Sequence, residues 1–303
     1  MRRRVDPGLL LILTPILWGA TFPATKIALR TLPVPTFMAW SRTLGLLAIV
    51  ALLPVLRRAG HSPRALRAVL WPGLVLGGLM FVAYLLQTEG QARTTATNAG
   101  FITGLYVVFA PILGAAFFGQ RVPASVWVAV AMSMVGLTLL SVTDLREIRL
   151  HAGDLLVLAG AIGWAGHITA VGRFSPRFPP WMLSLAQMGV ASALHLALAA
   201  GSGLRFEASL SASVWPLLVL TGVLGSGVAF TIQIVAQRTI TAGRAVVLLA
   251  GEALFAAAFA AVWIGERLSA HQWGGAGLVI AAMAYSELFA RRPRSARLDA
   301  AAP

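Results

Sequence analysis

Polar and ionisable side chains that interrupt long apolar stretches are the residues of this chain with the greatest capacity for chemistry. Glu252 lies about eight residues into the apolar stretch 244–264, roughly 12 Å from its start at the rise of an α-helix. A carboxylate at that depth needs a partner, a proton or water, because an isolated charge is costly in hydrocarbon. Glu252 therefore indicates either a proton-coupling site or counter-charge for a cationic group, or a structural carboxyl that fixes a helix contact.

Amide and imidazole groups occur within or at the ends of other apolar stretches. Gln87 with Gln91, and Gln233 with Gln237, are four residues apart and so share one face of a helix. Amides donate and accept hydrogen bonds without net charge, so they suit either a polar cavity that binds a zwitterion or contacts between helices. His167 allows the same two interpretations: a pore-lining or proton-sensing group, or an imidazole hydrogen-bonded to another helix.

Two basic residues near span ends are expected to be structural. Arg42 lies about six residues into the stretch 36–56, and its long stem favours reaching the outer interface over binding an anionic group. Lys26, the only lysine, lies near the end of the stretch 8–29 and is expected to be an interfacial anchor. Five aromatic residues are candidates for the wall of a ligand pocket, although such residues more often pack or form interfacial belts: Trp18, Phe22, Tyr84, Tyr106 and Trp164.

Signatures of enzymes are missing from the sequence. It contains no His-Glu-x-x-His, no Gly-x-Ser-x-Gly and no Gly-rich loop that ends in Lys-Ser/Thr. It has no cysteine, and its five histidines are scattered without the spacing of metal ligands. We therefore expect no enzyme activity, no metal and no cofactor.

The elements that must hold these residues are ten apolar stretches. They are 8–29, 36–56, 68–89, 96–118, 124–143, 153–173, 180–200, 213–236, 244–264 and 270–290. Each is close to the 20 or so residues that a membrane-spanning helix requires. The composition agrees, with 58% apolar and 11% charged residues. Strands of a membrane β-barrel would be about half as long and would alternate in polarity.

The second five stretches repeat the first five. Trp18, Gln87, Gln91, Gly119, Arg121 and Trp127 recur 146 positions later as Trp164, Gln233, Gln237, Gly265, Arg267 and Trp273. Since five is odd, the second copy enters the membrane from the opposite side, as in many secondary transporters. The sequence thus predicts an all-α integral membrane protein of ten transmembrane helices in two inverted five-helix repeats, 8–143 and 153–290.

Basic residues predict the orientation. With the N-terminus in the cytoplasm, inner segments carry 16 of the 24 basic residues and outer segments carry seven. This excess places both termini, including a basic tail at 291–303, in the cytoplasm. The net charge of +14 is explained by these helix-end arginines and anionic lipid headgroups, so we expect no nucleic acid partner.

The chain resembles the drug/metabolite transporter superfamily, specifically proteins with two EamA domains. The matching residues are Trp18-Gly19-Ala20-Thr21-Phe22, Lys26, Arg42, Leu86-Gln87-Thr88, Thr97 to Val108, Pro111, Trp164, His167, Arg173, Gln233, Gln237, Glu252 and Gly265-Glu266-Arg267-Leu268. The likeness extends over roughly residues 8–290. One departure is Ala253, where the family usually has proline after the glutamate, and this weakens the expectation of a kink there.

The resemblance implies a central cavity that faces alternately in and out, in a bacterial cytoplasmic (inner) membrane. It also implies transport of small organic solutes, often export of amino acids or related metabolites, with proton coupling at Glu252 as one role. Carried onto this sequence, it names as cavity candidates Trp18, Thr21, Gln87, Thr103, Tyr106, His167, Gln233 and Glu252. The alternatives are a non-transporting membrane scaffold or sensor, and an intramembrane enzyme. The sequence fixes neither substrate nor oligomeric state.

Overall fold

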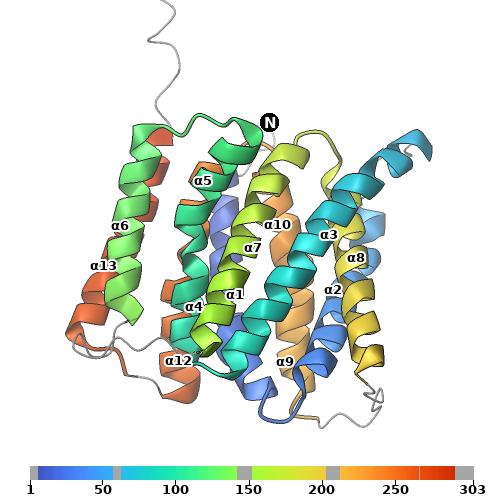
Figure 1. Ribbon diagram of the computed structural model, residues 1–303, viewed down its shortest axis with the longest axis horizontal. Helices are drawn as coiled ribbons and strands as arrows, with labels where there is room; N and C mark the ends of the chain where they lie inside the picture. The colour runs from blue at the N-terminus through green and yellow to red at the C-terminus, as the bar shows by residue number, and fades with distance from the viewer. Residues whose placement is uncertain (1–5, 57–62, 142–151, 203–211, 266, 291–303) are drawn as a thin grey trace, which may run out of the picture.

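The computed structural model describes residues 6–56, 63–141, 152–202, 212–265 and 267–290, and every regular element within those ranges is helical (Figure 1). The chain up to residue 141 forms α1 (Pro7–Ala28), α2 (Val34–Leu56), α3 (Pro63–Ala92), α4 (Ala96–Gly104), α5 (Tyr106–Phe118) and α6 (Ala124–Ser141). The rest forms α7 (Ala152–Phe174), α8 (Pro180–Gly201), α9 (Trp215–Val219), the π-helix η1 (Leu220–Val228), α10 (Ala229–Ala236), α11 (Ala242–Leu249), α12 (Glu252–Ile264) and α13 (Ala270–Ala290).

Eight segments of the described chain are long and apolar enough to cross a membrane. Three of them are interrupted: α4 with α5, α9 with η1 and α10, and α11 with α12. The two remaining stretches expected as spans correspond to α6, a shorter apolar helix, and α13, and these two helices pack side by side (Figure 1). The expected all-helical membrane fold is confirmed.

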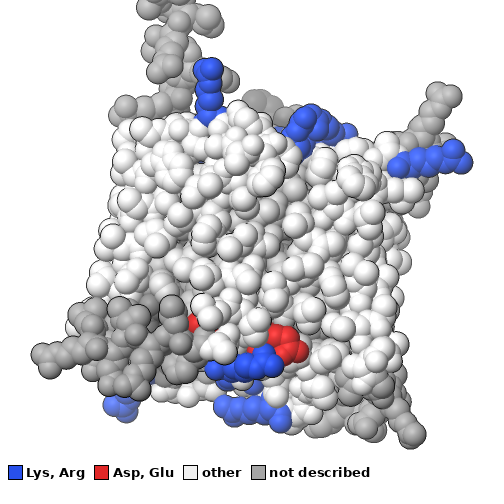
Figure 2. Space-filling view, in the orientation of Figure 1, with Lys and Arg blue, Asp and Glu red and all other residues white. Residues whose placement is uncertain are grey.

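The charged side chains visible on the face drawn in Figure 2 lie toward the two ends of the helix bundle, whereas Arg42 and Glu252 are buried inside it. On this face, lysine and arginine gather along two opposite edges, and no charged side chain is visible in the band between them. Helix α1 begins and α13 ends on the same side of the molecule (Figure 1). Such a band suits the hydrocarbon core of a bilayer. The basic tail 291–303 lies outside the described residues.

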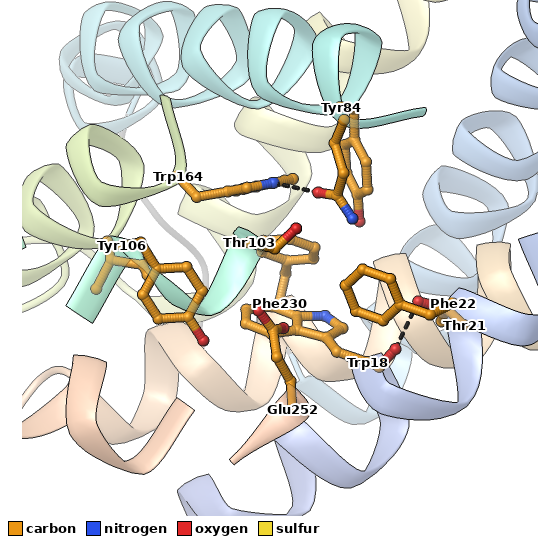
Figure 3. Close-up of a pocket in the computed structure, with 11 residues that line it drawn as sticks. Trp18, Thr21, Phe22, Tyr84, Thr103, Tyr106, Trp164, Phe230 and Glu252 are labelled. Atoms are coloured by element: carbon orange, nitrogen blue, oxygen red, sulfur yellow. Dashed lines mark hydrogen bonds between the residues drawn. The ribbon is translucent and has the colours of Figure 1, made fainter. Parts of the chain in front are cut away.

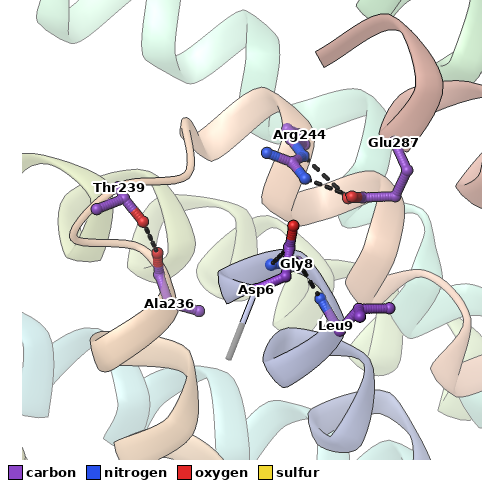
Figure 4. Close-up of polar contacts among 7 residues, drawn as sticks. All are labelled: Asp6, Gly8, Leu9, Ala236, Thr239, Arg244 and Glu287. Atoms are coloured by element: carbon purple, nitrogen blue, oxygen red, sulfur yellow. Dashed lines mark hydrogen bonds and ion pairs between the residues drawn. The ribbon is translucent and has the colours of Figure 1, made fainter. Parts of the chain in front are cut away.

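Two sets of polar contacts lie beside each other at the end where α1 begins, one within α1 and one between α11 and α13 (Figure 4). The carboxylate of Asp6 caps α1 by accepting from the backbone N–H groups of Gly8 and Leu9, at 2.8 and 3.4 Å. Beside it, the Arg244 guanidinium forms an ion pair with Glu287. A Cβ on Gly8 would lie 2.6 Å from Glu287 Oε2, so this pair packs directly against the backbone of α1.

Small residues let helices approach closely, as is usual in membrane bundles. Helices α6 and α13 meet at Gly136 and Gly275. A Cβ on Gly275 would lie 2.6 Å from the carbonyl oxygen of Gly136, and a Cβ on Gly136 would lie 2.9 Å from that of Gly275. Helices α3 and α7 meet in the same way at Gly90 and Gly153.

Two spans break at positions that are 146 residues apart. The first breaks at Leu105, between α4 and α5, and the second at Ala250 and Gly251, between α11 and α12. The second break forms although Ala253 stands where the family usually has proline. The absence of that proline made a kink less expected, and the structure shows that the helix is interrupted there nonetheless. Gly251 fits there because a Cβ would lie 2.8 Å from Met283 Sδ.

The stretch 213–236 contains a π-helix that the sequence pattern does not predict. Its wider turns redirect backbone carbonyl groups, as is common near functional sites. The carbonyl oxygen of Gly225 accepts a hydrogen bond of 2.9 Å from Trp18 Nε1. Gly222 packs against α2, where an added Cβ would lie 2.5 Å from the carbonyl oxygen of Ser41.

Candidate functional site

A cavity lies among helices α1, α3, α4, α5, α7, α10 and α12 (Figure 3). Its lining residues come from both parts of the chain. They are Trp18, Thr21 and Phe22 of α1, Tyr84 and Gln87 of α3, Thr103 of α4, Tyr106 of α5, Trp164 and Ile168 of α7, Phe230 of α10, and Glu252 of α12.

Aromatic rings form most of the wall. Phe230 lies with its ring centre 4.7 Å from that of Trp18 and 5.5 Å from that of Trp164. Tyr84 packs edge-on against Trp164 with ring centres 4.6 Å apart. These contacts hold the rings in fixed orientations, since aromatic pairs favour offset and edge-to-face geometry. The wall suits a solute with a flat or apolar portion.

Glu252 is the one acidic residue of the lining, and it is 3% exposed. It is the first residue of α12, where the positive end of the helix dipole favours a carboxylate. Within the described chain, its Oε1 atom has no hydrogen-bond partner, and neither has the Thr103 hydroxyl. Figure 3 shows the carboxyl group and the side chain of Tyr106 directed into the same space. The cavity therefore offers a carboxyl group with unused hydrogen-bonding capacity.

Most of the lining consists of equivalent positions in the two sequence copies. Eight of the eleven residues form four pairs that are 146 positions apart: Trp18 with Trp164, Phe22 with Ile168, Tyr84 with Phe230, and Tyr106 with Glu252. Sequence reasoning missed Ile168 and Phe230. Applying the same offset to Phe22 and Tyr84 would have found both.

The structure brings six of the eight candidate residues to the cavity and leaves two outside its lining. Trp18, Thr21, Gln87, Thr103, Tyr106 and Glu252 line it, and Gln87 Oε1 accepts a hydrogen bond from Trp164 Nε1. His167 is fully buried behind Trp164, with Nε2 3.1 Å from Gln187 Oε1. Gln233 is fully buried and donates to Gln237 Oε1 at 2.8 Å.

Gln91 and Gln237, the second glutamine of each pair, connect helices through equivalent hydrogen bonds. Gln91 Nε2 donates to the carbonyl oxygen of Phe22 at 2.6 Å. Gln237 Nε2 donates to that of Ile168 at 3.0 Å. Both donor and acceptor are shifted by 146 positions, so these two amides make equivalent contacts between helices.

Arg42 does not reach the interface, contrary to the sequence-based expectation. It is 2% exposed, and its guanidinium carbon lies 3.7 Å from the centre of the Tyr84 ring. A snorkelling arginine would place its head in the headgroup region. The π-face of Tyr84 and the Ser41 hydroxyl, which accepts from Nη2 at 3.1 Å, hold the head inside instead.

Lys26 is bound by the end of α3. Its Nζ atom donates to the carbonyl oxygens of Gln91, Ala92 and Thr94 at 3.1, 3.2 and 2.6 Å. A cation is favourable there because the last carbonyl groups of a helix have no helical partner and carry the negative end of its dipole.

Lys26→Met is therefore expected to weaken the fold and leave solute affinity unchanged. Loss of three charge-assisted hydrogen bonds at a half-exposed site costs about 1–2 kcal/mol. The measurement is the thermal unfolding midpoint of purified protein in detergent, together with the KM of transport. A large rise in KM with an unchanged midpoint would instead make Lys26 a ligand contact.

Within the described ranges, no three His, Asp or Glu side chains come together as ligands of a metal ion would.

Comparison with known proteins identifies related sequences over nearly the whole chain. The model of the EamA-like transporter family matches residues 7–142 and again residues 151–286. An "Uncharacterized transporter" of Archaeoglobus fulgidus is 29% identical over 93% of this chain and 85% of its own length. The "Uncharacterized transporter YvbV" of Bacillus subtilis is 28% identical over 72% of this chain and 68% of its own length. A crystal structure, 20% identical, shares the fold with a TM-score of 0.73 over 94% of this chain and 98% of that chain.

Proposed function

Because the chain belongs to the EamA-like transporter family of the drug/metabolite transporter superfamily, and is a membrane transporter, we propose that it exports small organic metabolites such as amino acids. The observation that carries the proposal is the aromatic cavity with Glu252 in its wall, built largely from four pairs of positions 146 residues apart. A solute site between two copies of one unit is the arrangement expected of alternating access.

In this proposal the chain crosses the membrane ten times, as inverted repeats 8–143 and 153–290. Supporting features recur at the 146-residue offset in the structure: the hydrogen bonds from Gln91 and Gln237, the helix caps at Thr95 and Thr241, and the helix ends at Gly119 and Gly265. Both glycines have positive φ, 61° and 71°, a conformation that glycine adopts readily. Both termini would face the cytoplasm of a bacterial cell.

The breaks at Leu105 and at Ala250–Gly251 are the proposed bending points. Each separates a short half-helix, α4 or α11, from a longer one, α5 or α12. The residue that follows each break, Tyr106 or Glu252, lines the cavity. Rocking of the two repeats would therefore move these side chains as it opens the cavity to one side or the other.

Glu252 is the proposed point of coupling to protons. A single carboxyl group can hold either a proton or the cationic group of a solute, but not both. Binding of a proton from outside would displace the solute, and binding of a solute from inside would displace the proton. This competition gives exchange of one proton for one solute, which drives export wherever the proton gradient points inward.

Mass-spectrometric profiling of cells and spent medium is the direct test. It compares cells that overproduce the wild-type protein, cells with an empty vector, and cells that overproduce Glu252→Gln at matched membrane levels. We expect one class of solute to become enriched outside and depleted inside with the wild type alone. Depletion from the medium would reverse the proposed direction, and no change in any solute would favour a scaffold or sensor.

A further inference from the structure

Arg42 is a buried cation with unused hydrogen-bond donors. Its Nη2 atom donates to Ser41, while Nε and Nη1 have no partner within the described chain. Stacking on Tyr84 compensates part of the burial, but it satisfies none of these N–H groups. Unpaired charge in a protein interior is costly, and ionisable residues at membrane depth commonly mark pathways for solutes or ions.

Arg42 faces a small polar pocket that adjoins the aromatic cavity. The pocket is lined by Arg42 with Thr21, Thr25, Phe37, Tyr84, Gln87, Thr88, Gln91 and Thr221. Thr21, Tyr84 and Gln87 line the aromatic cavity as well. The two pockets therefore share part of their walls, and Tyr84 has the cavity on one side and the Arg42 guanidinium stacked on its ring.

Arg42 and Glu252 are buried residues of opposite charge, and each lies at a position where the two sequence copies differ. The position equivalent to Arg42 is occupied by Met188, and the position equivalent to Glu252 by Tyr106. Arg42 is eight residues from the start of α2, roughly 12 Å along the helix, and Glu252 is 12 residues from the end of α12, roughly 18 Å. The positive charge thus lies nearer the proposed outer side, and the negative charge lies deeper.

We propose that Arg42 is an anion-binding subsite that receives the carboxylate of the transported solute. This inference rests on the proposed function and narrows its substrate class to solutes that carry a carboxylate. Guanidinium matches a carboxylate in charge and donor geometry. Glu252 then receives the ammonium group, and the aromatic wall receives the side chain of an amino-acid-like zwitterion.

Two matched mixtures test the subsite in proteoliposomes: the standard amino acids other than aspartate and glutamate, and the corresponding α-amides, which keep the ammonium group and lack the carboxylate. Efflux is followed by mass spectrometry for the wild type, Arg42→Met and Glu287→Gln. Methionine is the residue that the repeat itself places at the equivalent position. We expect the wild type to transport members of the first mixture only. Arg42→Met should reduce the rate at limiting solute at least about 30-fold, and Glu287→Gln should not.

Thermal unfolding without solute separates this role from a structural one. Replacing an unpaired buried charge with an apolar residue of similar length should maintain or raise the unfolding midpoint of Arg42→Met. The same variant should lose the rise in midpoint that the amino acid mixture gives the wild type. A lower midpoint without solute, with transport by the remaining folded protein unchanged, would make Arg42 structural and overturn the proposal.

Other outcomes also overturn it and can be told apart. Equal transport of amides and amino acids would mean that the carboxylate is not recognised. Stabilisation of the wild type by sodium chloride alone, with none by any amino acid, would assign the subsite to a bulk anion. Transport of other solutes found by profiling, but of no amino acid, would refute the substrate class while the transporter assignment stands. Absence of flux for every solute would instead refute the proposed function.

Discussion

Glu252→Gln is expected to lower the rate of solute efflux from proteoliposomes at least about tenfold, which corresponds to roughly 1.4 kcal/mol. Glutamine keeps the shape of the side chain but can neither bind a proton at this site nor oppose a cationic group. The residual flux should no longer respond to a pH difference imposed across the membrane. Initial rates with and without that difference, and a pH-sensitive dye inside the vesicles, measure both effects.

Glu287→Gln is the matched control for this experiment. Glu287 is also a carboxylate in a helix, but it pairs with Arg244 at the end of the bundle and lies outside the cavity lining (Figure 4). Its removal should leave the rate and its pH response close to those of the wild type. If Glu252→Gln behaves like this control, the coupling role assigned to Glu252 is wrong.

Gly275→Ala is expected to lower the thermal unfolding midpoint in detergent by roughly 3–10 °C. The added Cβ would lie 2.6 Å from two backbone atoms of α6, the carbonyl oxygen of Gly136 and the amide nitrogen of Leu140. Backbone atoms cannot rotate away as a flexible side chain can, so α6 and α13 must separate along their contact. The loss should exceed the stabilisation that alanine normally gives a helix over glycine.

Gly274→Ala supplies the comparison in the same helix. A Cβ at the neighbouring position would meet no atom within 4 Å. Its unfolding midpoint should stay the same or rise slightly, because only the helix preference changes. Equal midpoints for the two variants would contradict the close packing of α6 against α13.

The sequence predicts the bounds of several long helices well because a bilayer fixes how long an apolar helix must be. The stretch 96–118 matches the outer bounds of α4 and α5, and the stretch 270–290 matches α13. The interruptions within spans are harder to predict. The break before Glu252 lacks a proline. The glycines of the π-helix η1 pack against α1 and α2, and no local pattern encodes these contacts.

The residues of the cavity can be predicted from the sequence where the 146-residue offset relates a lining position of one copy to the equivalent position of the other. The 146-residue offset identifies Trp18 and Trp164 as a pair, and the same offset from Tyr84 leads to Phe230. The burial of Arg42 could not be foreseen, because a long basic side chain near a span end can reach water or turn inward. Its direction is decided by the position of the Tyr84 ring on a different helix.

The contact between Trp18 and Trp164 gives the protein an optical reporter of its own. Their indole rings lie with centres 6.5 Å apart and planes inclined at 33°, in the wall of the cavity. Neighbouring chromophores at that spacing couple electronically, so their near-ultraviolet circular dichroism depends on relative orientation. A solute that enters between them must change this signal, and cavity occupancy can be followed by light without any attached label.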